Sequence, residues 1–390
     1  MPKYLCQACK MVYDEPRDGR CPHCGESAAM VLDFSNSDEY LKQQTPKVIA
    51  ERKHLGLVGL VGSLAAVIIN TEGDRQKAAA SELLRFTGYV YDTTFEEQQY
   101  TTCALKCAGS ADFLIRSRKD GKNPFLEYSL APKSRHLPNT RLETLVFHTV
   151  DIEKYVEIQK ARGIRFLTDD IIRRDHYAFI QTRPSRFTGN SIGLIQWHGE
   201  KGNYKSHGDR ELPWNLRKPD YAYLRNIGRL DHCATRIRAK DRDPAIMEFM
   251  NLTNYKFDFA IYVKSQNSIT NVSRLSMNEY AMVFTSGIAP YVSDELSGPT
   301  EKFIHNYNTR VHHMAFTTKD IENVFAELGR DGMDYLVNLV GSEDEGLKQT
   351  FTVASPTTLL VNEYIHRYGD FDGFFTRSNV TLLTEATKKQ

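Results

Sequence analysis

The sequence has no excess of charge of either sign, because 50 Lys and Arg residues stand against 49 Asp and Glu residues, for a formal net charge of +1. A chain this neutral offers no electrostatic basis for binding nucleic acid or an anionic membrane. Long apolar runs are also absent: the most apolar stretch, residues 55–69, contains three glycines and is too short to span a bilayer. The N-terminus lacks the apolar core of a signal peptide. We therefore expect a cytoplasmic protein.

The chain has seven cysteines, an odd number, and its sequence begins without a secretory signal. Both observations argue against a disulfide framework. Four of them form two C-x-x-C pairs separated by eleven residues: Cys6, Cys9, Cys21 and Cys24. Four thiolates at this spacing suit a tetrahedral zinc or iron site, which would supply most of the folding free energy of so short a segment. Residues 1–29 thus resemble a rubredoxin-like or zinc-ribbon domain. The polar residues 30–55 are expected to form a linker with one helical turn.

Two pairs of internal repeats organise the rest of the chain. Residues 147–153 and 316–322 both fit the pattern F-x-T-x-D-I-E, and residues 66–92 resemble residues 232–258. Each copy reads as a strand, a helix and then further strands. The sequence therefore predicts an α+β protein of four βαβββ modules in two pairs, with curved and mostly antiparallel sheets. The expected parts are a first pair at 56–200, a linker at 201–227 and a second pair with a closing C-terminal helix at 228–390.

The repeats differ at three positions that could hold a metal. His232 falls opposite Ala66 in the repeat. His313 falls opposite Thr144, and the strand that contains Glu363 has a counterpart without any carboxylate. Two neutral imidazoles and a carboxylate suit a divalent first-row metal, and with three open positions they form the facial triad of non-haem Fe(II) oxygenases. A carboxylate among apolar residues also needs a partner, because burying it alone is costly.

At these positions the second half of the chain resembles a known family. The stretches LDHCATRI, VHHMAFTTKDI, LKQTFT and VNEYIHRYGDFDGFF, within residues 228–385, resemble the catalytic half of the 4-hydroxyphenylpyruvate dioxygenases. That family belongs to the vicinal-oxygen-chelate superfamily, whose fold consists of paired βαβββ modules. The resemblance implies that His232, His313 and Glu363 bind Fe(II), and that the C-terminal helix closes the pocket.

The resemblance also implies which residues meet the substrate. Gln349 and Asn278 match a glutamine and an asparagine that orient the substrate in the family. Three aromatic residues would stack on the substrate or cover it: Phe351, Phe374 and Phe375. His312 occupies a position where the family has glutamine. Because neighbouring strand residues face opposite sides, His312 is expected on the other face of the strand from His313 or at the edge of the pocket.

The implied reaction is the oxidative decarboxylation of an aromatic 2-oxo acid with hydroxylation of the ring. The leading substrates are 4-hydroxyphenylpyruvate and dioxygen, with homogentisate as product. Three alternatives stay open: a relative that forms a hydroxymandelate, an extradiol dioxygenase that cleaves a catechol, and a non-catalytic binding protein. The sequence also leaves open whether the chain forms a homo-oligomer and whether the four-cysteine site holds zinc or iron.

Overall fold

The computed structural model describes residues 3–6, 12–13, 20–25, 29–32, 38–120, 122–369, 371 and 373–390. The N-terminal part contains three short strands, which pair in the order β2-β1-β3: β1 (Lys3–Cys6), β2 (Val12–Tyr13) and β3 (Ala29–Leu32). In the described part of the chain, no helix combines the length and the apolar composition needed to cross a bilayer.

Four modules follow, each built from a strand, a helix and three further strands. The first pair contains β4 (Val61–Asn70), α2 (Gln76–Phe86), β5 (Val90–Glu96), β6 (Tyr100–Lys106) and β7 (Asp112–Arg118), then β8 (Arg141–Thr149), α3 (Ile152–Ala161), β9 (Ile172–Arg173), β10 (Tyr177–Gln181) and β11 (Ser191–Trp197). The second pair contains β13 (Ile227–Ile237), α4 (Arg242–Leu252), β14 (Lys256–Val263), β15 (Ser268–Arg274) and β16 (Ala281–Gly287), then β17 (Arg310–Thr318), α6 (Ile321–Arg330), β18 (Val340–Ser342), β19 (Leu347–Phe351) and β20 (Val361–Arg367). The predicted α+β fold of four βαβββ modules is confirmed.

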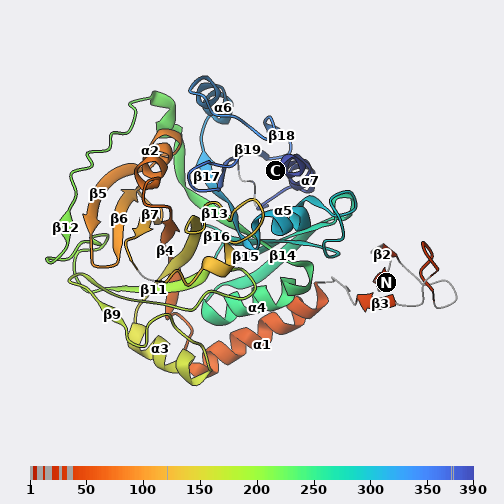
Figure 1. Ribbon diagram of the computed structural model, residues 1–390, viewed down its shortest axis with the longest axis horizontal. Helices are drawn as coiled ribbons and strands as arrows, with labels where there is room; N and C mark the ends of the chain where they lie inside the picture. Colours follow the sequence, from red (N-terminus) through yellow and green to blue (C-terminus); the bar gives the residue numbers. More distant parts are fainter. Residues whose placement is uncertain are drawn as a thin grey trace.

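Each pair of modules forms one sheet (Figure 1). The strand orders are β12-β5-β6-β7-β4-β8-β11-β10-β9, where β12 is Arg210–Glu211, and β14-β15-β16-β13-β17-β20-β19-β18. At the centre of each sheet the first strands of the two modules pair antiparallel, and each is flanked by the parallel last strand of its own module. The two halves of the chain therefore place equivalent residues at equivalent points of two sheets.

Helix α1 (Glu39–Leu55) lies in the segment that the sequence predicted as a linker, and it is longer than the single helical turn expected there. The helix has 17 residues and packs on α4, as Figure 1 also shows. The helix contains Pro46 and is mostly polar, so the sequence shows no clear helical pattern in this segment. Only three of its residues are buried: Leu41, Val48 and Arg52.

One apolar core joins the two halves of the protein. The ring of Tyr89 stacks on Phe113 at 3.9 Å between centroids, and both rings meet Phe316 of the second half edge-on. Residues on the other face of the first sheet form a separate apolar cluster that includes five aromatic side chains: Phe95, Tyr177, Phe179, Tyr204 and the partly buried Trp197.

The corresponding face of the second sheet is covered by two helices and the chain end. These are α5 (Pro299–Tyr307), which contacts β13 and β16, and α7 (Arg377–Ala386), which contacts β14, β18 and β19. The two helices lie beside each other near the C-terminus (Figure 1). The space between them and the sheet holds the candidate site.

Candidate metal centre

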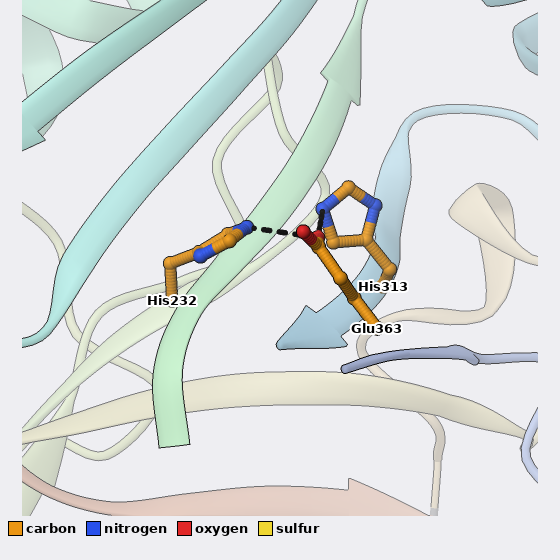
Figure 2. A group of neighbouring side chains, drawn as sticks. All are labelled: His232, His313 and Glu363. Atoms are coloured by element: carbon orange, nitrogen blue, oxygen red, sulfur yellow. Dashed lines mark ion pairs between the residues drawn. The ribbon is translucent and has the colours of Figure 1, made fainter. Parts of the chain in front are cut away.

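Three strands of the second sheet bring His232, His313 and Glu363 together (Figure 2). In the strand register His232 lies opposite Ala315, and Ala315 lies opposite Glu363, so that the histidine and the carboxylate share one row across the sheet. Oε2 of Glu363 is 3.1 Å from Nε2 of His232 and 3.2 Å from Nε2 of His313. All three residues are buried.

The donor set fits a divalent first-row metal. The candidate ligand atoms all lie within 4.8 Å of one another, and no second group of this kind occurs among the described residues. Nε2 of His232 is buried and makes no directed hydrogen bond, although the carboxylate of Glu363 is close. An unsatisfied buried nitrogen beside a carboxylate and a second imidazole is the arrangement that a cation between them would complete.

Burial and neighbouring charges act differently on the two imidazoles. Burial opposes the charge of His232, but Glu363 and Asp231 outweigh it and raise the pKa of His232 to about 9. Burial, together with His312 and His232, holds the pKa of His313 well below its usual range. Without a metal, His232 therefore holds a proton beside Glu363. A bound cation would replace that proton.

Two hydrogen-bonded chains fix the orientation of the ligands. Asp231 accepts from both Nδ1 of His232, at 2.8 Å, and the guanidinium of Arg367, at 2.7 and 3.0 Å. On the other side, the amide of Gln349 donates to Oε1 of Glu363 at 2.5 Å, and the amide of Asn379 donates to Gln349 at 3.0 Å. Partners of this kind set the tautomer and the direction of metal-binding side chains.

His312 lies on the same side of the sheet as His313, because β17 has a bulge at this point. The register steps from Ala234–His313 to Thr235–Val311, so that His312 is the extra residue in the strand. A bulge interrupts the alternation of faces, and the argument from alternation therefore does not hold here. Nδ1 of His312 is 2.8 Å from Nδ1 of His313, and its Nε2 is 2.8 Å from Oε1 of Gln390.

The same bulge occurs in the first half of the chain. There the register steps from Ile68–Thr144 to Ile69–Leu142, which makes Glu143 the extra residue. Glu143 forms a buried ion pair with Arg118 at 2.6 Å. The irregularity thus belongs to the fold itself, while the residue placed on it differs between the halves.

A small cavity of about 40 Å³ opens beside two of the candidate ligands, His313 and Glu363. The ring of Phe351 lies 4.7 Å from His313, and those of Phe374 and Phe375 lie 5.4 and 5.2 Å from His232. Residues that line the cavity come from the sheet and from α7: Ala234, Arg236, Thr270, Val283, Thr285, His312, His313, Phe351, Glu363, Phe375, Val380, Leu383 and Thr384. The three aromatic residues expected near the substrate therefore surround the metal centre.

Asn278 is not brought into this group. It is exposed on the turn between β15 and β16 and does not line the cavity. Conversely, Arg236, Thr270 and Thr285 line the cavity and were missed by the sequence reasoning. A signal was available for the arginine, since it follows His232 by four residues and a strand places residues two and four apart on one face.

The first sheet cannot bind a metal at the equivalent place. The counterparts of the two histidines are Ala66 and Thr144, and the strand register puts Gly193 at the position of Glu363. A Cβ atom on Gly193 would lie only 3.0 Å from the methyl group of Thr144. Apolar packing fills the place of the carboxylate in this half.

The four-cysteine site predicted at the N-terminus is described only in part. Cys9 lies outside the described residues, and for Cys6 only the backbone in β1 is described. The second pair forms a tight turn in which the backbone N–H of His23 donates to Sγ of Cys21 at 3.4 Å and Gly25 closes the turn at φ +75°. Metal binding by Cys6, Cys9, Cys21 and Cys24 stays a prediction.

Comparisons with known proteins identify the fold. No protein-family model and no curated protein matches the sequence. Among solved structures, a triple mutant of 4-hydroxymandelate synthase from Streptomyces coelicolor superposes with a TM-score of 0.65 at 17% identity, covering 84% of this chain and 98% of that one. A xylose isomerase-like TIM barrel/4-hydroxyphenylpyruvate dioxygenase fusion protein gives 0.58 at 12% identity, covering 84% of this chain and 52% of that one. The chain has the vicinal-oxygen-chelate fold of these proteins.

Proposed function

We propose that the chain is an Fe(II)-dependent dioxygenase of the 4-hydroxyphenylpyruvate dioxygenase kind, which oxidatively decarboxylates an aromatic 2-oxo acid. The observation that carries the proposal is the buried cluster of His232, His313 and Glu363 beside a cavity. The fold shared with 4-hydroxymandelate synthase supports this reaction class. Residues on three separate strands that converge on one point argue against a binding protein without catalysis.

His232, His313 and Glu363 would hold the iron. Iron held by these residues would supply the chemistry that activates dioxygen beside a bound 2-oxo acid. The protein's own groups keep the ligands ready for this task. Gln349 holds Oε1 of Glu363, which leaves Oε2 directed at the two imidazoles. Phe351, Phe374 and Phe375 surround the site with apolar surface and exclude water from it.

The first substrate to test is 4-hydroxyphenylpyruvate. An apolar middle section of the cavity with Val283 and Phe375 suits an aromatic ring. Ring hydroxylation would give homogentisate, and hydroxylation of the benzylic carbon would give a hydroxymandelate. Both products start from the same decarboxylation.

The test is a gas-exchange assay on protein loaded with Fe(II) under argon. Oxygen is then admitted with one of several aromatic 2-oxo acids or catechols, and oxygen uptake and carbon dioxide release are recorded together. The proposal expects one carbon dioxide per oxygen with a 2-oxo acid, and no turnover by the Glu363→Ala variant. Oxygen uptake with a catechol and no carbon dioxide would instead identify an extradiol enzyme. Binding without any oxygen uptake would identify a binding protein.

A further inference from the structure

A row of polar residues crosses the wall of the cavity on the α5 side. In the strand register Arg236 of β13 lies opposite Thr285 of β16, and Thr285 lies opposite Thr270 of β15. All three line the cavity. The next row toward the metal centre is apolar, with Ala234 opposite Val283. The cavity therefore has a metal centre, an apolar middle and a polar row in succession.

The spacing of these rows matches a small aromatic molecule. Arg236 follows His232 by four residues in one strand, which separates their backbone positions by roughly 13 Å. Arg236 lines the same cavity as His313 and Glu363, and Glu363 lies 3.1 Å from His232. A 2-oxo acid bound at the metal centre would thus place its ring against the apolar row and its far end at the polar row.

Arg236 is a buried cation without a counter-charge. Its side chain is only 4% exposed, and it forms no ion pair or hydrogen bond with any other residue that the structure describes. Its Nη1 is buried and unsatisfied. Its guanidinium lies over the ring of Phe303 on α5, 4.9 Å from the ring centroid, and burial lowers the pKa of Arg236 to about 9. The hydroxyls of Thr270 and Thr285 are likewise without side-chain partners among the described residues.

A buried, unpaired guanidinium destabilises the folded state. Its presence in a ligand cavity therefore indicates a role in binding. Arginine and threonine hydroxyls together suit a carboxylate, because the guanidinium offers parallel donors in a planar fork. A neutral far end, such as a phenol, would leave the charge of Arg236 uncompensated. We propose that the physiological substrate is an aromatic 2-oxo acid with a second anionic group, a carboxylate above all, at its far end, bound by Arg236, Thr285 and Thr270. This inference rests on the proposed function for the 2-oxo acid, but not for the anion subsite.

Binding measured without turnover tests the inference. Full-length protein loaded with Fe(II) is titrated under argon in a calorimeter with three probes: 4-carboxyphenylpyruvate, phenylpyruvate and terephthalate. We expect 4-carboxyphenylpyruvate to bind about 10- to 100-fold more tightly than phenylpyruvate, as a charge-assisted hydrogen bond implies. Equal affinity of the two 2-oxo acids for the unmodified protein overturns the inference, and this comparison requires no variant.

Substitutions then assign the effect to Arg236. Arg236→Met should abolish the advantage of the carboxylated probe and leave phenylpyruvate binding unchanged, while Arg236→Lys should retain part of it. Thr285→Val is the matched control for the loss of a single neutral hydrogen bond, and it should lower the affinity for 4-carboxyphenylpyruvate about fivefold. An equal loss for both probes in Arg236→Met would overturn the inference, because it would mean a structural role.

Two further results separate this inference from the proposed function. Removing a buried unpaired charge should leave Arg236→Met with a melting temperature equal to or above that of the unmodified protein. A fall in the melting temperature of Arg236→Met but not of Arg236→Lys would show that the cation stabilises the fold and would count against the inference. If neither 2-oxo acid binds while terephthalate binds in an Arg236-dependent way, the anion subsite stands and the proposed function fails.

Discussion

The Nδ1 atoms of His312 and His313 lie 2.8 Å apart, so two residues adjacent in one strand share a hydrogen bond. If Nε2 of His313 faces the metal, its Nδ1 carries the proton and donates to Nδ1 of His312. The remaining proton of His312 is then on Nε2 and donates to Oε1 of Gln390 at 2.8 Å. This tautomer pattern follows from the hydrogen-bond network. It makes His312 a positioning residue for the ligand His313.

Substitution of His312 tests this role. His312→Ala removes the acceptor for Nδ1 of His313 and should weaken Fe(II) affinity by roughly tenfold or more. His312→Gln supplies an amide oxygen that can accept the same hydrogen bond, so it should keep the iron and change turnover. The measurement is an anaerobic Fe(II) titration with a competing chelator. Equal iron affinity of the alanine variant and the unmodified protein would remove His312 from this role.

Loss of one of the proposed iron ligands should reduce iron binding more than substitution of His312 does. His313→Ala and Glu363→Ala each leave two donors in place of three, and both should retain less than a tenth of the iron of the unmodified protein after gel filtration. Metal content by plasma emission spectrometry is the measurement. His366→Ala is the control, because this histidine lies on the same strand as Glu363 but bonds to the carbonyl of Thr318 instead. Equal loss in the control would point to general damage to β20.

The bridge made by Asp231 predicts coupling between Arg367 and the metal. Asp231→Asn should lower iron affinity by roughly 10- to 100-fold, because an amide cannot stabilise His232 as the carboxylate does. Arg367→Gln should lower iron affinity by a smaller factor. In the double variant, the loss in the free energy of iron binding should be smaller than the sum of the losses in the two single variants. A double-mutant cycle of iron affinities measures this coupling. Strict additivity would show that Arg367 acts independently of the metal centre.

Glu301 on α5 predicts a pH dependence of stability. Burial raises the pKa of Glu301 to about 7, against backbone N–H donors of Ala239 and Gly287 that favour the charged form. The folded protein therefore holds this proton more tightly than the unfolded chain, with its value of 4.5. Stability should fall by about 3 kcal/mol as the pH rises from about 4.5 to about 7.

Glu301→Gln keeps both acceptor bonds and should remove that slope, so the variant becomes the more stable protein at pH 8. Chemical denaturation between pH 5 and pH 8 measures the difference. The exposed Glu157→Gln on α3 serves as the control and should follow the unmodified protein. A slope that persists in Glu301→Gln would assign the titration to another group.

The four-cysteine prediction has its own test. Titration with a mercurial reagent should release one metal per chain beyond the metal of the His–His–Glu centre, and Cys9→Ser should abolish this release. A red-brown ferric-thiolate spectrum in the isolated protein would identify iron, and a colourless protein that contains zinc would identify zinc. Release of no additional metal would contradict the prediction.

The sequence predicts the four modules and the candidate metal centre because both follow from its internal repeat. Shared packing residues fix the register of the two halves, and His232 and His313 stand out where the counterparts are Ala66 and Thr144. Glu363 stands out because a carboxylate in an apolar strand needs a partner. These signals can be read from the sequence alone, without knowledge of the tertiary structure.

Other features depend on pairing between strands, which one sequence does not display. The bulge at His312 exists only in the register of β17 against β13. The isolation of Arg236 depends on α5 and on its row with Thr285. Helix α1 is stabilised by α4 and not by its own pattern. Asn278 was predicted from a motif match, and such a match does not distinguish an exposed turn, where Asn278 lies, from a pocket wall.

The continuous core makes the two halves one cooperative unit. Tyr155 of the first half donates to the carbonyl of Leu252 in the second half at 2.7 Å. Tyr364 of the second half donates to the carbonyl of Phe86 in the first half, also at 2.7 Å. Opening either half would expose these buried groups, so neither unfolds alone at low cost. Iron bound in the second half would then protect backbone amides in the first, which contributes no ligand. The first half would then contribute to the free energy of metal binding through the shared core, although it contains none of the candidate ligands.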